Sequence, residues 1–161
     1  MQQAQVLSIM LLDTLTCSKW ITPRTTENIL QWREFRRSIT KDHLNVVATA
    51  WQNCKLTEPY LEFDDYRHWP DPWTLISSGL YDDTAVALGI FYTLYFTSYG
   101  KKDSMVIEVY RDRKKHEYLN LVRCEGGLYT LNYQDGVVVN NLTISPTAEL
   151  VNTVTAKQLK I

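Results

Sequence analysis

The chain has 161 residues, of which 45% are hydrophobic and 22% are charged. This is the composition of one globular domain, with or without an arm, and it excludes disordered and fibrous proteins. Its 17 Lys and Arg residues balance 18 Asp and Glu residues, and its longest basic run is Arg113-Lys114-Lys115. Binding to nucleic acid through charge is therefore not expected.

The first third of the chain has a helical pattern. The apolar run Val6–Leu12 predicts a short helix. A second helix is expected from Pro23 to about Ile39, where apolar and aromatic residues recur at helical spacing. A third is expected to run to about Trp51, with Thr40 as its N-cap.

The middle of the chain begins with an irregular aromatic segment. Residues 58–73 contain Pro70 and Pro72, which make regular structure there unexpected. A long apolar helix follows, with Asp82 or Asp83 as its cap, and Gly100 is expected to end it. Because apolar residues cover most of its circumference, this helix is predicted to be buried at the centre of the fold.

The rest of the chain up to about residue 140 has the alternation of antiparallel strands. The expected strands are Met105–Tyr110, His116–Cys124, Leu128–Tyr133 and Val137–Val139. The charged segment Arg111–Lys115, then Gly126-Gly127 and Asp135-Gly136, supply the turns. The tail Ser145–Ile161 has a poor apolar pattern and is expected to form either a weak helix or an arm.

Together these patterns predict an α+β fold. N-terminal helices and one buried central helix would pack on an antiparallel β-meander. The expected division is a helical N-terminal arm or subdomain over residues 1–54, an α+β core over 55–140 and a C-terminal tail over 141–161.

Membrane, metal and cofactor signals are weak. The longest apolar stretch, Ala85–Phe96, is too short to span a bilayer. The histidines do not lie at ligand spacing, so neither a metal nor a cofactor is expected. Three cysteines without a Cys-x-x-Cys pair are expected to be reduced thiols of a protein made in the cytoplasm: Cys17, Cys54 and Cys124.

The segment around the central helix resembles the transglutaminase-like and papain-like thiol enzymes. Pro72–Ile76 followed by Gly79–Ala85 is similar to the leader and the Gly-x-Cys-x-Asp element that opens the central helix in that family. His116 opens a strand as the family's His does, and Asn132 lies on the next strand, where the family has Asp or Asn. The resemblance implies a nucleophile–base–orienter triad at the start of the central helix.

The chain departs from this pattern at the nucleophile, because the position of the family's Cys is Tyr81. A phenol is a poor acyl-transfer nucleophile and cannot form a thioester. The resemblance thus implies degenerate triad positions at Tyr81, His116 and Asn132, and a fold without transglutaminase or protease activity. The plainer interpretation is a packed aromatic residue for Tyr81, a hairpin-edge residue for His116 and a strand or turn residue for Asn132.

A second resemblance concerns function. Trp69–Trp73 and Ala85–Leu94 are similar to a Trp-Pro-x-Pro-Trp leader and an Ala-Leu-Gly-x-x-Tyr-Thr-Leu helix in small proteins of contractile-tailed phages, notably cyanophages. Trp20 together with Trp32–Arg36 resembles an element of phage tail-fibre and tail-assembly proteins. These resemblances imply a structural tail or baseplate subunit located in the virion.

Such a subunit would contact other tail or baseplate proteins, in several copies per particle, and neither nucleic acid nor a membrane. Aromatic and Arg side chains are the candidate partner-binding residues: Trp20, Trp32, Arg33, Phe35, Arg36, Trp69 and Trp73. The segment 68–73 is otherwise a packed loop. Two other functions stay open: an active thiol enzyme that uses another cysteine such as Cys54, and a tail-assembly chaperone absent from the mature particle.

Overall fold

The computed structural model of the chain describes residues 25–55 and 57–161. Within them four α-helices accompany one five-stranded antiparallel sheet, so the predicted α+β class is confirmed. The helices are α2 (Thr25–Ser38), α3 (His43–Ala50), α4 (Pro72–Ser78) and α5 (Asp83–Tyr95). The strands are β1 (Val106–Asp112), β2 (Glu117–Cys124), β3 (Tyr129–Leu131), β4 (Val139–Asn140) and β5 (Ala148–Val154). Short 3₁₀ turns are η2 (Tyr66–His68), η3 (Lys102–Ser104) and η4 (Glu125–Gly127).

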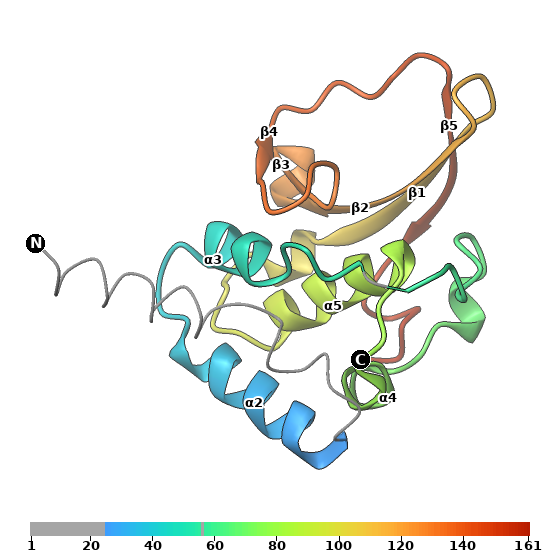
Figure 1. Ribbon diagram of the computed structural model, residues 1–161. Coiled ribbons are helices and arrows are strands. Elements are labelled where there is room, and N and C mark those ends of the chain that lie inside the picture. The colour runs from blue at the N-terminus through green and yellow to red at the C-terminus, as the bar shows by residue number, and fades with distance from the viewer. Residues whose placement is uncertain (1–24, 56) are drawn as a thin grey trace, which may run out of the picture.

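Helix α5 lies at the centre of the molecule. The sheet covers one side of it, through β1 and β2, and α3 and α4 pack against it elsewhere (Figure 1). Every side chain from Thr84 to Leu94 is buried, as its all-round apolar pattern predicts. One buried cluster joins residues from α2, α3, α5 and the sheet with Leu159 near the C-terminus, so the described parts of all three expected segments share a core.

The boundaries of α5 follow from its caps. Asp82 is the N-cap, as predicted, and its carboxylate accepts a hydrogen bond from the Ala85 amide. The prediction that Gly100 ends the helix is wrong, because α5 ends at Tyr95. The Thr97 hydroxyl donates to the Leu94 carbonyl (2.8 Å), and the Lys102 ammonium donates to the Tyr95 carbonyl (3.2 Å). These side chains satisfy carbonyls that another helical turn would have used.

The N-terminal helices are partly as expected. The segment Val6–Leu12, like Pro23, lies outside the described residues. Helix α2 buries Trp32 and Phe35 at helical spacing, and Ile39, the residue after its end, is buried as well. The predicted N-cap of α3 is wrong, because the cap residue is Asp42, whose backbone has the left-handed φ of 50° and whose side chain makes no capping hydrogen bond.

The prolines of the aromatic segment mark a helix that the sequence interpretation missed. Pro72 is the first residue of α4, and Asp71 is its N-cap. Proline is favoured at this position because its missing N–H would have no partner in the helix and its φ is already helical. The expectation of an irregular segment up to residue 73 is therefore wrong at its end.

The sheet has the strand order β4-β3-β2-β1-β5. The predicted meander is present, with Val106 paired to Arg123 and Asp112 paired to Glu117 at the two ends of the β1–β2 ladder. Strand β1 runs on to Asp112, so Arg111 belongs to the strand rather than to the turn. Strand β3 is shorter than expected and ends at Leu131.

The expectation of a weak helix or an arm after Ser145 is wrong, because this segment forms β5. Strand β5 pairs antiparallel with β1, from Asp112 opposite Ala148 to Ile107 opposite Val154. The register shifts between Val109 and Tyr110. An edge strand with one irregularity and few buried side chains shows no clean alternation in sequence.

None of the helices within the described residues has an apolar run of the length that crossing a bilayer requires.

Replacing Gly89 by Ala is expected to lower the free energy of unfolding by about 3 kcal/mol, the upper end for overpacking. A Cβ at Gly89 would overlap the six-membered ring of Trp51, with Cζ3 only 2.6 Å away. This ring cannot move freely, because Trp51 is buried and its Nε1 donates to Thr93 Oγ1 at 3.0 Å. Urea denaturation measures the loss.

The matched control is Gly100→Ala, because no heavy atom lies within 4 Å of a Cβ at that glycine. Its stability should stay within about 0.5 kcal/mol of the parent. Equal stability of the two variants would show that the contact between α5 and Trp51 is loose.

Candidate functional site

The sequence predicts a degenerate active site at the start of α5. In the structure Asp82 lies at this point as the N-cap of the helix. The buried Asp82 carboxylate accepts hydrogen bonds from three amides, those of Ala85, Tyr60 and Leu61, each at 2.8 Å. A helix N-terminus stabilises an anion through free N–H groups. Here Asp82 is itself that anion, so it occupies the position that a thiolate would need.

Tyr81 precedes this cap and is a core residue. Its side chain is 1% exposed. Its ring meets the Trp51 ring edge-to-face, with 5.0 Å between centroids. Burial raises the pKa of the Tyr81 phenol far above its usual value. A neutral, enclosed phenol can neither attack a carbonyl nor exchange protons with solvent.

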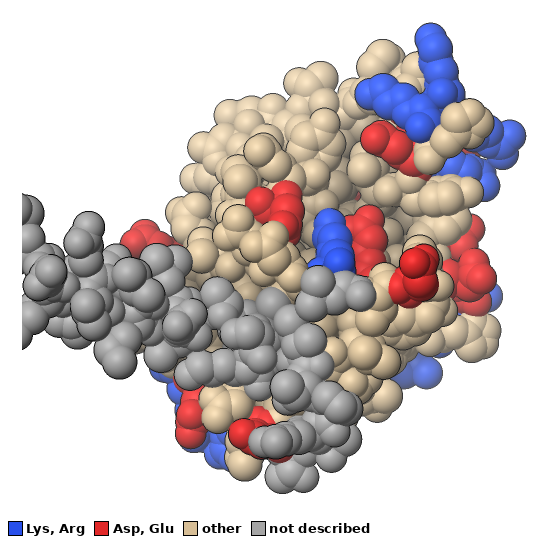
Figure 2. Space-filling view, viewed as in Figure 1, with Lys and Arg blue, Asp and Glu red and all other residues tan. Residues whose placement is uncertain are grey.

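His116 does not lie at the start of α5. It is exposed in the turn between β1 and β2, with a left-handed φ of 54°. Figure 2 shows Lys and Arg side chains gathered at the corner that this turn occupies in Figure 1. Asn132 follows Leu131, which pairs with Val122 on β2. His116 is six positions from Val122 and precedes the first residue of β2, so it lies roughly 20 Å away along the strand direction.

Asn132 does lie beside the start of α5. Its Nδ2 donates to the Asn120 carbonyl at 2.9 Å and to the Asp83 carbonyl at 3.4 Å. The structure therefore brings Asn132, the candidate orienting residue, and Tyr81, the candidate nucleophile position, to the same end of α5. The base position, His116, is left at the far end of β2.

Asn120 occupies the place on β2 that faces α5, and the sequence interpretation missed it. Its Oδ1 accepts from the Thr84 hydroxyl at 3.3 Å, and its Nδ2 donates to the Phe63 carbonyl at 3.0 Å. A carboxamide does not ionise near neutral pH, so Asn120 cannot act as a general acid or base. The available signal was a polar residue in the otherwise apolar run Leu119–Val122.

A hollow of about 360 Å³ opens beside this end of α5. Its wall includes the aromatic rings of Tyr60, Phe63 and Tyr118 together with the carboxylates of Asp82 and Asp83. Lys55 pairs with Asp83 at 2.6 Å. The lining carries neither Cys nor His, so among the described residues this hollow offers binding contacts rather than a nucleophile and base.

The cysteines do not supply a displaced nucleophile in the described part of the chain. Cys54 is buried and disulfide-bonded, so the expectation of three reduced thiols is wrong for this residue. Cys124 is a buried free thiol, and burial raises its pKa to about 12. Cys17 lies outside the described residues.

Cys124 is expected to resist thiol reagents in the native protein. With a pKa of about 12, about one thiol in ten thousand is ionised at pH 8, and the thiolate is the reactive form. Mass spectrometry after iodoacetamide treatment should find Cys124 unlabelled under native conditions and labelled in urea. Rapid native labelling would mean that β2 opens locally.

Three of the predicted partner-binding aromatics are core residues instead. Trp32 is fully buried and donates from Nε1 to Thr93 Oγ1 at 2.9 Å. Phe35 is buried beside it on α2, and the buried Trp69 donates to the Glu62 carbonyl at 2.8 Å. These side chains are used inside the chain, so the prediction that they form an exposed contact surface is wrong.

The other predicted contact residues have mixed positions. Arg33 is exposed on α2, and Trp73 is 48% exposed on α4, which packs against α2. Arg36 lies over the Trp32 ring, 4.1 Å from its centroid, and is half-buried. Trp20 lies outside the described residues. The exposed candidates that remain are Arg33 and Trp73.

No group of three or more His, Cys, Asp and Glu side chains in residues 25–55 and 57–161 could hold a metal ion. Comparisons with known proteins give no further identification: no family model, no curated protein and no solved structure matches this chain.

Proposed function

We propose that this protein is a non-catalytic structural subunit, a tail or baseplate component of a contractile-tailed phage built on a transglutaminase-like fold. The observation that carries the non-catalytic part is the start of α5, where Tyr81 is enclosed and Asp82 takes the amide donors. Chemistry of the thiol-enzyme type needs an exposed nucleophile at that point. At that point the chain has instead the buried Tyr81 ring and the Asp82 cap, and both side chains stabilise the fold.

The exposed face of α2 and α4 supports a contact role. Trp73 is 48% exposed and Leu30 is 50% exposed, and Arg33 lies one turn along from Leu30 on α2. Aromatic and Arg side chains are the residue types that anchor protein interfaces. Neighbouring tail or baseplate proteins, in several copies per particle, are the partners we propose.

The phage assignment rests on the sequence resemblances. The Trp-Pro-Asp-Pro-Trp segment becomes the entry to α4, and the Ala-Leu-Gly motif lies within α5. The Ala-Leu-Gly motif is buried in α5, and the Trp-Pro-Asp-Pro-Trp segment buries Trp69 and Pro72 but leaves Trp73 exposed. We place the protein in the virion on this basis.

An activity assay tests the non-catalytic claim. Purified protein is expected to show no amidase, peptidase or cross-linking turnover, and His116→Ala is expected to change neither this result nor the stability. Turnover that His116→Ala abolishes would overturn the claim. Turnover lost on alkylation of one cysteine would instead establish the thiol enzyme.

Mass spectrometry of purified particles tests the structural claim. The chain is expected in mature virions, whereas a tail-assembly chaperone would be missing from them. Arg33→Glu is expected to lower incorporation severalfold. Arg113→Glu, the same charge change on the exposed β1–β2 turn, serves as the control. Equal incorporation of both variants would mean that the face formed by α2 and α4 does not contact neighbouring proteins in the particle.

A further inference from the structure

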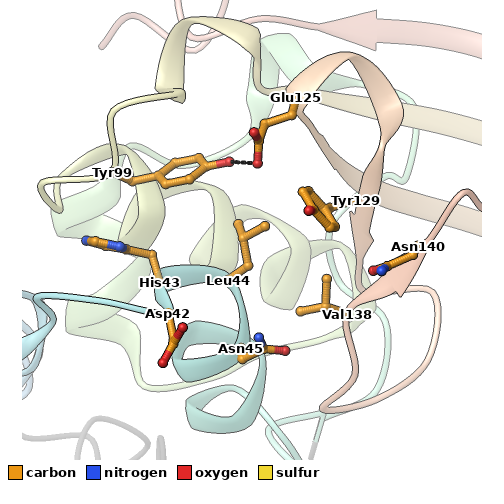
Figure 3. A pocket seen from close by; sticks show the side chains of 9 residues that line it. All are labelled: Asp42, His43, Leu44, Asn45, Tyr99, Glu125, Tyr129, Val138 and Asn140. Atoms are coloured by element: carbon orange, nitrogen blue, oxygen red, sulfur yellow. Dashed lines mark hydrogen bonds between the residues drawn. The ribbon is translucent and has the colours of Figure 1, made fainter.

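A cavity of about 530 Å³ lies apart from the start of α5. It is open to solvent and is lined by the first turn of α3, the segment after α5, η4 and the β3–β4 hairpin. Figure 3 shows Leu44, Tyr129 and Val138 around the open space and the Tyr99 phenol reaching the Glu125 carboxylate at its edge. The volume is in the range of small-ligand sites.

Glu125 is held in a fixed position at this edge. The Tyr99 hydroxyl donates to Glu125 Oε2 at 2.9 Å, and the Glu125 amide donates to Ser104 Oγ at 3.1 Å. Burial, followed by the bond to Glu125, raises the pKa of Tyr99 far above its usual value. Tyr99 is therefore a permanent neutral donor, and it leaves the second carboxylate oxygen, Oε1, for another partner.

The charge of Glu125 is not compensated. The ion pairs among the described residues involve other carboxylates, so Glu125 has no cationic partner there. A second carboxylate, Asp42, lines the cavity, and the lining includes neither Lys nor Arg. The one titratable base of the lining is His43, whose Nε2 is 3.1 Å from Ser98 Oγ. A partly buried carboxylate without an ion-pair partner at a pocket of this kind is a natural counter-ion for a bound cation.

The backbone at the two acidic residues is strained as well. Asp42 has a φ of 50° and Glu125 a φ of 53°, in the left-handed region that costs energy for residues other than glycine. Such conformations gather at ligand sites, where the surrounding structure holds them. Asp42 and Glu125 both line this cavity.

We propose that this cavity binds a cationic group, an ammonium or a guanidinium. Glu125 is its counter-ion, and the rings of Tyr129 and Tyr99 supply aromatic contacts that favour a cation. The same chemistry comes from two sources, a free amine or a Lys or Arg side chain of a neighbouring protein. The proposal is independent of the structural role in a phage tail, because it stands on the cavity alone.

The test is a titration of the isotopically labelled full chain, followed by amide chemical shifts. The ligands are agmatine, N-acetyl-arginine amide and N-acetyl-citrulline amide, which has nearly the shape of the arginine derivative without its charge. We expect saturable shifts around Tyr99, Glu125 and Tyr129 with the two cations and none with citrulline. Tighter binding of agmatine indicates a free amine, whereas tighter binding of the arginine derivative indicates a protein side chain.

Glu125→Gln keeps the shape of the side chain and removes its charge. It is expected to raise the Kd of the cations about tenfold to a hundredfold. Glu117→Gln removes the same charge on exposed β2 and should leave the Kd unchanged. The proposal is overturned if citrulline binds as well as arginine, if a neutral saccharide binds in place of the cations, or if both variants weaken binding equally.

Discussion

Asp82→Ala is expected to lower the free energy of unfolding by about 3–6 kcal/mol, the largest effect of any single substitution considered for this chain. The carboxylate accepts from the amides of Ala85, Tyr60 and Leu61, and it is buried. Its removal takes the N-cap from α5, worth about 1 kcal/mol. It also takes the acceptor from the part-buried N–H groups of Tyr60 and Leu61, at about 1–2.5 kcal/mol each. Urea unfolding followed by circular dichroism measures the loss.

Asp71→Ala is the matched control. Asp71 is also an N-cap, but it is exposed, and it bonds to Thr74 through the amide at 3.0 Å and the hydroxyl at 2.8 Å. Its loss should cost about 1 kcal/mol, the usual cost of a cap. Asp82→Asn keeps one acceptor oxygen and should fall between the two. Similar losses at both caps would mean that the segment around Tyr60 is not tied to α5.

The central helix was predictable because its determinants are local. Asp82 and the apolar run after it specify where α5 begins and that it is buried, and both are present in the structure. Its end was not predictable, because the Lys102 side chain caps it from a different segment. Similarly, Pro72 was interpreted as a breaker although it begins α4 after an Asp cap.

The residues of the candidate site were predicted one by one, without knowledge of how the strands pair. For this reason the prediction was wrong for His116. The order of elements placed His116 and Asn132 on adjacent strands, as the resemblance requires. Only the pairing of β2 with β3 shows that Asn132 lies beside the middle of β2, whereas His116 lies on the hairpin turn at the end of that strand. Distance along a strand depends on pairing between strands, and a single sequence does not contain it.

The edge strand β5 and the cavity beside Glu125 could not be predicted from the sequence. Strand β5 is half-exposed and irregular, so its pairing with β1 has no periodic signal. The cavity draws Leu44, Tyr99, Glu125 and Val138 from four separate segments. Its key pair, Tyr99 and Glu125, is 26 residues apart and is joined by a side-chain bond. No local motif marks such an arrangement.

Thr93→Val is the second large effect, expected at about 2–6 kcal/mol of the free energy of unfolding. The Thr93 hydroxyl donates to the Gly89 carbonyl at 2.6 Å, and it accepts from the indole N–H groups of Trp32 at 2.9 Å and Trp51 at 3.0 Å. One hydroxyl thus uses its donor and both acceptor sites. Valine would leave two buried indole N–H groups unpaired, at about 1–3 kcal/mol each.

Thr93→Ser keeps the hydroxyl and loses one methyl group, so it should cost only about 1 kcal/mol. Trp32→Phe then separates the hydrogen bond from packing, because it removes one indole N–H and leaves an aromatic ring against α5. In the Thr93→Val background this substitution should cost less than in the parent, since the N–H it deletes is already unpaired. Additive losses would mean that the hydrogen bond between Trp32 and Thr93 contributes nothing to stability. A positive coupling would show that this bond, and not only the packing of the indole ring, holds α2 against α5.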